Sequence, residues 1–148
     1  MDRRLIVRPS VPEDIIPIAE DISELDRNDL REFGSALLNL GYGLHYSDIC
    51  YTIATRDGRP LGMFGAVPWG DQQASMWMIS TNELVTTYRV QLAREGRKWA
   101  DWVLTKYPVL TNFVPIGHKH RWLTWVGFKD VGTFVYNNQK FRKMERRK

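Results

Sequence analysis

The sequence predicts a single α/β domain with a mixed, mostly antiparallel sheet flanked by helices. Three observations lead to this fold class. The chain has 148 residues, a length that suits one hydrophobic core rather than two. Apolar residues recur at helical spacing over residues 11–40 and alternate over residues 49–80. Over residues 74–136 the pattern then predicts a strand, a helix, a strand, a helix and a strand in succession.

The first part of the chain predicts a short strand and two helices. The strand covers residues 5–7. Ser10–Glu13 has the spacing of a capping box, so a helix is expected from about residue 11, and Pro17 weakens its early part. A second apolar stripe over residues 30–40 predicts another helix, with Gly41 as its C-terminal cap.

The middle of the chain predicts an antiparallel meander of three strands. Residues 49–54 and 61–67 alternate, and Asp57–Gly58 supplies the turn between them. A turn rich in glycine and aspartate then leads to a third strand over residues 74–80.

A capping-box spacing from Ser80 to Glu83 opens the longest predicted helix, and Pro108 ends it. Because glycine is costly inside a helix, Gly96 on the buried stripe predicts a close approach of the backbone to the sheet. The stripe consists of Tyr88, Leu92, Gly96, Trp99, Val103 and Tyr107. Residues 109–114 then read as a strand reached by a parallel crossover.

The last part of the chain predicts a short helix and a closing hairpin. The helix covers residues 118–126 and Gly127 ends it. The hairpin is formed by residues 128–136 and 139–144, with an Asn137–Asn138 turn between them.

Tryptophan and cysteine usage give further expectations. Of six tryptophans, five follow residue 76, and we expect most to lie in the core with hydrogen-bonded indole N–H groups. Cys50 is the sole cysteine, so it forms no internal disulfide and is expected to be a free buried thiol in a reducing cytosol. Neither a signal-peptide hydrophobic region nor an apolar run of roughly 18 residues is present, so we expect a cytoplasmic protein without a membrane partner.

The positive charge is concentrated at the C-terminal end. The formal net charge is +4, but residues 140–148 hold six basic groups and one acid and contribute +5, which leaves −1 for the rest. We therefore divide the chain into a domain over residues 1–139 and a basic strand end and tail over 140–148. A solvated tail, contact with an acidic protein, or contact with nucleic acid would each fit, and no nucleic-acid-binding motif is present.

The predicted element order and one local motif resemble the GNAT superfamily of N-acetyltransferases across nearly the whole chain. The motif is the segment from Trp122 to Phe128, whose end resembles the Tyr-x-x-x-Gly-Phe pattern that closes the short helix in that superfamily. The opening segment Leu5–Pro9, with Glu13–Ile15, is similar to its first strand and helix.

A narrower likeness covers about residues 57–128, which resemble a small family of internal virion proteins of short-tailed bacteriophages. The shared features are a Pro-Leu strand entry at Pro60–Leu61, an aromatic-rich fourth strand, a basic helix ending in Lys106–Tyr107, and the glycine-terminated short helix. The likeness implies a phage origin, a role in virion assembly, and residence in the host cytoplasm or in the virion. It also implies a phage or host protein as partner.

The GNAT resemblance implies acetyl-CoA as cofactor if the protein is active. In the superfamily, a glycine-rich loop between the fourth strand and the long helix binds the pyrophosphate through backbone N–H groups. The corresponding turn contains Ser80, Thr81 and Asn82 but no glycine, and Glu83 adds a carboxylate. In their place, the positive charges of Arg89, Arg94 and Arg97 are candidates for phosphate binding.

The acid and base of acetyl transfer are harder to find. The resemblance places the usual tyrosine acid at the position of Leu123, and the candidates to replace it, Tyr88, Tyr107 and Tyr136, are better explained as packing residues of the core or its rim. Candidates for the general base are His118, His120, Asp71 and Glu83. No Cys/His spacing indicates a metal site.

Three functions remain open. The first is a phage GNAT-fold protein with a degenerate acetyl-CoA site, used in the virion or its assembly. The second is an active acetyl-CoA-dependent N-acetyltransferase that modifies a protein amine. The third is a small host-directed inhibitor that binds its target through residues 140–148.

Overall fold

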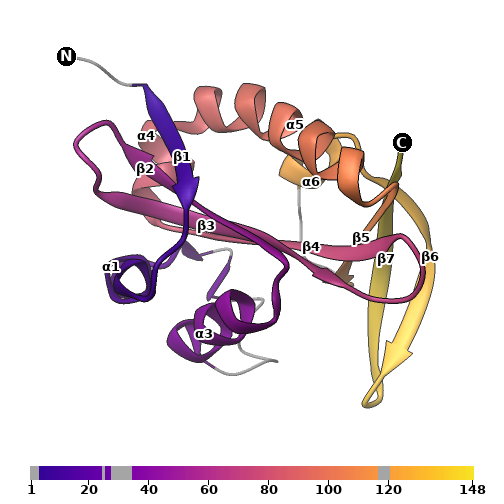
Figure 1. The fold of residues 1–148 in the computed structure, drawn as a ribbon. Coiled ribbons are helices and arrows are strands. Elements are labelled where there is room, and N and C mark those ends of the chain that lie inside the picture. Colours follow the sequence, from indigo (N-terminus) through magenta and orange to yellow (C-terminus); the bar gives the residue numbers. More distant parts are fainter. Residues whose placement is uncertain (1–3, 25, 28–34, 117–120) are drawn as a thin grey trace. The chain divides into compact units, whose positions relative to one another are not determined.

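The computed structural model describes residues 4–24, 26–27, 35–116 and 121–148 (Figure 1). Within these residues the strands form one sheet in the order β1-β2-β3-β4-β5-β7-β6. β4 and β5 pair in parallel, whereas the pairs β1–β2, β2–β3, β5–β7 and β6–β7 are antiparallel. The strands are β1 (Leu5–Pro9), β2 (Ile49–Thr55), β3 (Pro60–Pro68), β4 (Gln73–Ser80), β5 (Val109–Pro115), β6 (Lys129–Tyr136) and β7 (Gln139–Arg147). The helices are the 3₁₀ helix η1 (Pro12–Asp14), α1 (Ile15–Glu20), α3 (Ala36–Tyr46), α4 (Asn82–Thr87), α5 (Arg89–Lys106) and α6 (Arg121–Trp125). The predicted fold class is confirmed.

The chain divides into two compact units, which are described separately. The first unit contains residues 1–67 and 77–92. Its core is a cluster of Ile18, Ile22, Leu40, Met63 and Ile79, to which α1, α3, β3 and β4 contribute. Since successive side chains of a strand point to opposite faces, the neighbour of Met63, Gly62, faces the other way, against Leu84 of α4. Helices therefore cover both faces of β3 in this unit.

The helix α3 begins and ends later than the sequence pattern predicts. Gly41 does not cap it, because the helix continues through Gly41 and Gly43 to Tyr46. Gly43 is needed for packing: a Cβ there would lie 2.4 Å from the Trp77 ring, whose N–H donates to Ser47 Oγ at 2.7 Å. A glycine that admits a neighbouring ring and a glycine that ends a helix look the same in the sequence. Residues 28–34 of the predicted stripe lie outside the described residues.

The predicted capping box at Ser10 is wrong by one residue. The N-cap is Val11, whose N–H donates to the carboxylate of Asp14 at 3.0 Å. Asp14 is almost fully buried and also accepts hydrogen bonds from Arg8 and Thr52. Burial alone would raise the pKa of Asp14, but these hydrogen bonds and the Arg8 charge outweigh it, and the pKa is lowered.

The second unit contains residues 68–76 and 93–148. Parallel pairing of Gln73–Ser75 with Val109–Thr111 confirms the predicted crossover. The predicted end of the short helix is also confirmed: Gly127 has φ +98°, and the N–H of Phe128 donates to the carbonyl of Leu123 at 2.9 Å. His118 and His120 of that predicted helix lie outside the described residues. The hairpin turns at Asn137 and Asn138, both at positive φ.

Three expectations about the second half need correction. Thr81 rather than Ser80 caps the long helix, which is interrupted at Tyr88 and so forms α4 and α5. Gly96 approaches Val126, at the end of α6, and not the sheet: a Cβ at Gly96 would lie 3.1 Å from Val126 Cγ1. None of the described tryptophan side chains is fully buried: Trp77, which packs against the core cluster of the first unit, and Trp99 are half-buried, and Trp69, Trp102 and Trp125 are exposed. The three exposed tryptophans lie in a turn and in two helices. The residue type alone does not show that these positions are at the surface.

The basic C-terminal segment is largely strand. β7 runs to Arg147 and pairs with β5 on one side and β6 on the other. The division of the chain at residue 139 stays a prediction.

Candidate functional site

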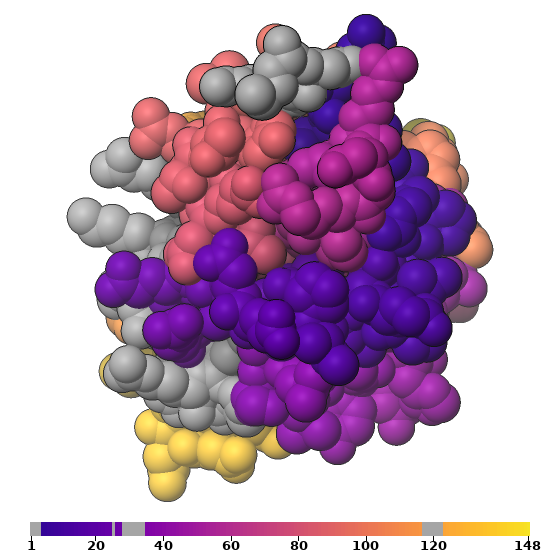
Figure 2. Space-filling view, turned by 90° about the vertical axis from the view of Figure 1, so that its left-hand side faces the viewer, coloured from indigo at the N-terminus to yellow at the C-terminus, as the bar shows by residue number. Residues whose placement is uncertain are grey.

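The candidate cofactor site is the turn that joins β4 to α4, from Ser80 to Glu83, in the first unit. Here the resemblance to GNAT enzymes placed the pyrophosphate. In Figure 2 the atoms around α4 are salmon, and those of the turn between β2 and β3, in magenta, lie beside them. Whether this turn can bind phosphate depends on which of its N–H groups are still unoccupied.

Thr81 is fully engaged within the protein. Its hydroxyl donates to the carbonyl oxygen of Leu61 at 2.7 Å and accepts from the N–H of Leu84 at 3.2 Å. Its own N–H donates to the same Leu61 carbonyl at 2.9 Å. Only 2% of Thr81 is exposed, so this residue offers a ligand nothing.

The first turn of α4 is also occupied, by Asp21. The N–H of Asn82 donates to the Asp21 carbonyl at 2.8 Å, and the N–H of Glu83 to the Asp21 carboxylate at 3.4 Å. The N–H of Val85 donates to the Thr81 carbonyl at 3.4 Å. With Leu84 bound to the Thr81 hydroxyl, all four N–H groups that a helix start could offer to an anion already have partners.

Ser80 is held by a second acidic residue, Asp26. The backbone N–H and the hydroxyl of Ser80 both donate to Asp26 Oδ2, each at 2.8 Å. The Ser80 carbonyl accepts from the N–H of Ser23 at 2.8 Å, and the Ser23 hydroxyl donates to Asp26 at 2.9 Å. The segment after α1 thus satisfies the end of β4 as a neighbouring strand would, through a bridge between Ile22 and Thr81.

The electrostatics of this turn are also unfavourable for phosphate. The groups that occupy its N–H donors include the carboxylates of Asp21 and Asp26, and Glu83 adds a third. A diphosphate brought to this turn would displace hydrogen bonds to carboxylates and meet like charges. The predicted role of Ser80, Thr81 and Asn82 therefore lacks structural support in the first unit.

Glu83 is committed to Arg59. Both guanidinium nitrogens of Arg59 donate to its two carboxylate oxygens, a two-pronged pair at the surface. The hydrogen bonds that Arg59 donates to Glu83 also raise the pKa of Arg59. A carboxylate held in this way is a poor candidate for the general base that the sequence suggested.

The three arginines proposed for the phosphates are spread over an arc of about 140° around α5. All three are exposed. Five residues separate Arg89 from Arg94, which corresponds to about 140° around a helix, whereas Arg94 and Arg97 are about 60° apart. Arg94 also pairs with Glu95 at 3.5 Å. Arg97 lies about 80° from Arg89, so the helix places Arg97 between the other two, with Arg94 and Arg89 at the ends of the arc.

The remaining candidates for a catalytic acid or base have surroundings that do not support such a role. Leu123, at the position of the usual tyrosine, is 1% exposed in α6 and serves as a core residue. Tyr88 is buried, Tyr136 is exposed on β6, and Asp71 is exposed in the turn between β3 and β4. Cys50 is half-buried, and this burial raises the pKa of its thiol, which disfavours a nucleophilic role.

Asp21, Ser23 and Asp26 are the residues that the sequence reasoning missed. One local signal was available, because Ser23 and Asp26 have the three-residue spacing of a helix-capping pair. No local signal shows that the same two side chains also satisfy Ser80, which lies more than fifty residues later.

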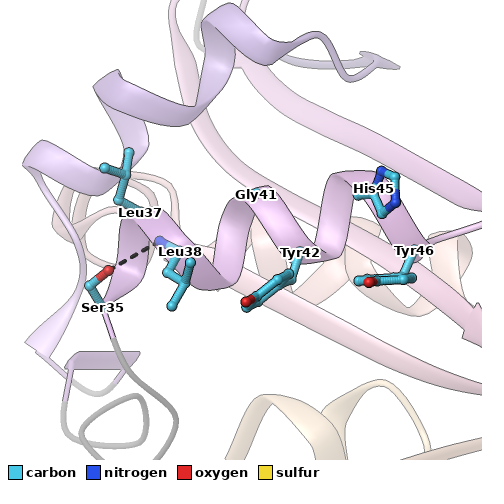
Figure 3. Close-up of a pocket in the computed structure, with 7 residues that line it drawn as sticks. All are labelled: Ser35, Leu37, Leu38, Gly41, Tyr42, His45 and Tyr46. Carbon is cyan, nitrogen blue, oxygen red and sulfur yellow. Dashed lines mark hydrogen bonds between the residues drawn. The ribbon is translucent and has the colours of Figure 1, made fainter.

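The first unit also has a shallow groove along α3. It is lined by Ser35, Leu37, Leu38, Gly41, Tyr42, His45 and Tyr46. Leu38, Tyr42 and Tyr46 follow one another along one side of α3 (Figure 3). The groove is apolar and holds no acid or base pair suited to acetyl transfer.

The described residues also lack a metal-binding cluster and a helix suited to cross a membrane. They contain no group of three or more His, Cys, Asp or Glu side chains that could hold a metal ion. None of their helices is long and apolar enough to cross a membrane.

Comparisons with known proteins identify the fold. No protein-family model and no curated protein matches the sequence. Solved structures do match. A GNAT-family acetyltransferase from Bacillus anthracis has a TM-score of 0.73 at 10% identity, over 98% of this chain and 95% of that one.

Two other solved structures agree. A spermidine N-acetyltransferase SpeG chimera from Vibrio cholerae and hSSAT has a TM-score of 0.71 at 16% identity, over 97% of this chain and 95% of its own. Ard1 from Thermoplasma volcanium has a TM-score of 0.65 at 15% identity, over 97% of both chains. This chain therefore has the fold of the GNAT acetyltransferases.

Proposed function

We propose that this protein is a bacteriophage protein with a GNAT fold that does not use acetyl-CoA, and that it acts in the virion or in virion assembly. The observation that carries the first part is the occupied turn after β4. Every first-turn N–H of α4 has a partner within the protein, and the backbone of Ser80 is held by Ser23 and Asp26. Binding a diphosphate there would require these hydrogen bonds to break.

Two further residues support a site that has lost its chemistry. Leu123 is buried where the superfamily has its tyrosine acid, and Glu83 is tied to Arg59. A fold and the reaction it usually hosts are separable, since a reaction depends on a few side chains and a fold on the whole pattern.

The virion role is an inference from the likeness of residues 57–128 to internal virion proteins of short-tailed phages. The protein would be made in the host cytoplasm and would meet its partner, a phage or host protein, there or in the particle.

An active N-acetyltransferase is the second candidate. It is favoured by the solved structures of acetyltransferases that match 97–98% of this chain. Acetyl-CoA would then be the cofactor, a protein amine the acceptor, and Arg94 and Arg97 the phosphate ligands.

Calorimetry with the full chain and acetyl-CoA separates the two. We expect no binding at concentrations up to about 1 mM, because the turn offers no unoccupied N–H donor. Micromolar affinity would overturn the proposal. If it is found, Arg94→Gln and Arg97→Gln should weaken it, with Lys98→Gln on the same helix as the matched control.

The virion role needs its own test. Mass spectrometry of purified particles should detect the protein, or deletion of its gene should reduce the yield of infectious particles. If the particles lack the protein and the yield is unchanged, the virion and assembly roles both fail.

A further inference from the structure

We propose that one face of the strands β5, β7 and β6 binds single-stranded nucleic acid. The surface in question, here called the aromatic face, presents four exposed rings. They are Trp69, Phe113, Phe134 and Tyr136, with 41%, 37%, 46% and 57% of each residue exposed. All four belong to the second unit. The inference is independent of whether acetyl-CoA binds.

Strand register places the rings on one face. Phe113 of β5 lies opposite Lys143 of β7, which lies opposite Gly132 of β6. Two residues along, Phe134 of β6 lies opposite Phe141 of β7. Residues directly opposite each other share a face, and so do alternate residues of one strand. Phe113, Phe134 and Lys143 therefore project from the same face, as does the residue two positions after Phe134, Tyr136.

The two phenylalanines form a small platform. Their ring centroids are 5.1 Å apart and their planes are tilted by 46°. Two residues before Phe134, β6 carries Gly132, where a Cβ would meet nothing within 4 Å. The space at Gly132 is thus open and every residue of β6 is exposed, whereas Phe141 of β7, opposite Phe134 on the same face, is buried.

Trp69 is held in place at the edge of this platform. Its indole N–H donates to the hydroxyl of Thr111 at 3.2 Å, on the same face of β5 as Phe113. The ammonium group of Lys143 lies 5.9 Å from the centre of the Trp69 ring. A fixed ring loses little entropy when a base stacks on it.

The charge of this face suits phosphate. Its charged side chains, by register, are Lys129, Lys143, Arg147 and Glu145, and Arg147 pairs with Glu145. Among the described residues no carboxylate pairs with Lys129 or Lys143. The whole segment 140–148 contributes +5, whereas the rest of the chain is at −1. By register, Lys140, Arg142 and Arg146 lie on the opposite face of β7, so the aromatic face itself carries +2, from Lys129, Lys143 and Arg147 less Glu145.

Single-stranded nucleic acid satisfies both features at once. It carries a phosphate and a flat base in each nucleotide, so lysines and rings on one surface bind the same strand. Bases in a duplex are stacked on each other and cannot reach such rings. The core of a protein interface usually excludes lysine, which makes a protein partner a poorer fit for rings interleaved with Lys143.

Fluorescence anisotropy with labelled dT15 and U15 tests the proposal on the full chain. We expect micromolar affinity at 50 mM salt and about tenfold weaker binding at 200 mM, as for two to three phosphate contacts. A duplex of the same length should bind at least about fivefold more weakly.

Variants separate stacking from charge. Phe113→Ala and Phe134→Ala should each weaken binding at least about fivefold, the effect of losing one stacked base. Lys143→Gln should weaken it and also reduce the salt dependence by about 0.7 in log–log slope. Tyr46→Ala on α3 is the control for an exposed ring, and Lys98→Gln on α5 for an exposed lysine.

Several results would overturn the proposal. They are absence of binding at 50 mM salt, binding that is indifferent to Phe113→Ala and Phe134→Ala, equal affinity for the duplex, and equal affinity for a polyglutamate peptide. Light scattering measures whether the chain forms a dimer through this face. If the chain is a dimer that Phe134→Ala dissociates, the aromatic face is an interface between two copies.

Discussion

The turn after β4 and the aromatic face differ in whether their potential binding groups already have partners within the protein. In the turn, each N–H donor from Ser80 to Val85 has a partner within the protein, and three carboxylates surround it. On the aromatic face, four rings and Lys129 are exposed and Lys143 is half-buried. A site that the fold family uses for a ligand is thus closed by the protein itself, while a surface without an assigned role has the composition of a binding surface. The following predictions test this contrast.

The largest loss of stability is expected for the buried ring in the strands of the aromatic face. Phe141, opposite Phe134 in the register, is 3% exposed. Phe141→Ala should lower the free energy of unfolding by about 3–4 kcal/mol, because it leaves a cavity. Urea denaturation measures this loss, and a value below 1 kcal/mol would show that the ring is not core.

Asp14 is the buried carboxylate of the first unit. Asp14→Asn should cost about 3 kcal/mol at pH 7, because Arg8 loses its charged partner in a largely buried site. Exposed Glu13→Gln is the control and should change stability by less than 0.5 kcal/mol.

The same pair gives a pH dependence. Since the pKa of Asp14 is lowered below its ordinary value of 3.8, the carboxylate stabilises the folded state above that pH. The stabilisation is lost as the pH falls through the lower folded-state pKa. The difference between wild type and Asp14→Asn should therefore shrink below about pH 4, and a difference that grows on acidification would contradict the assignment.

Asp26 closes the turn after β4. Asp26→Ala should cost about 2 kcal/mol, because the N–H and the hydroxyl of Ser80 lose their acceptor. Asp71→Ala, in an exposed turn, is the matched control. If Asp26→Ala is as mild as its control, the turn is not held closed in the way described.

Thr81 contributes less, as a helix cap. Thr81→Val should cost about 1 kcal/mol by removing its bonds to Leu84 and Leu61. Exposed Thr87→Val in the same helix is the control, and thermal unfolding followed by circular dichroism compares the two.

The smallest effect is expected on the open surface. Phe134→Ala should change the free energy of unfolding by about 0.5 kcal/mol, since 46% of the residue is exposed and only its contact with Phe113 is lost. A loss comparable to that of Phe141→Ala would mean that the ring serves the fold and not a ligand.

Most of the fold could be predicted because it depends on local patterns. The strands 49–54, 61–67 and 109–114, the Asn137–Asn138 turn and the end of α6 at Gly127 all lie where periodicity and turn chemistry placed them. The parallel crossover followed from connection length alone. The sequence also shows Leu123 at the position of the superfamily's usual tyrosine and no glycine in the turn after β4.

What only the tertiary structure decided concerns pairs of residues far apart in the chain. Nothing in the sequence around Gly43 shows that the ring of Trp77 packs against it. Ser23 and Asp26 look like a local cap until they are found on Ser80. The aromatic face joins Trp69, Phe113 and Phe134 from three segments, and no period of the sequence links them. The physical reason is the same in each case: local patterns determine which elements form, whereas long-range packing determines which polar groups and rings remain exposed.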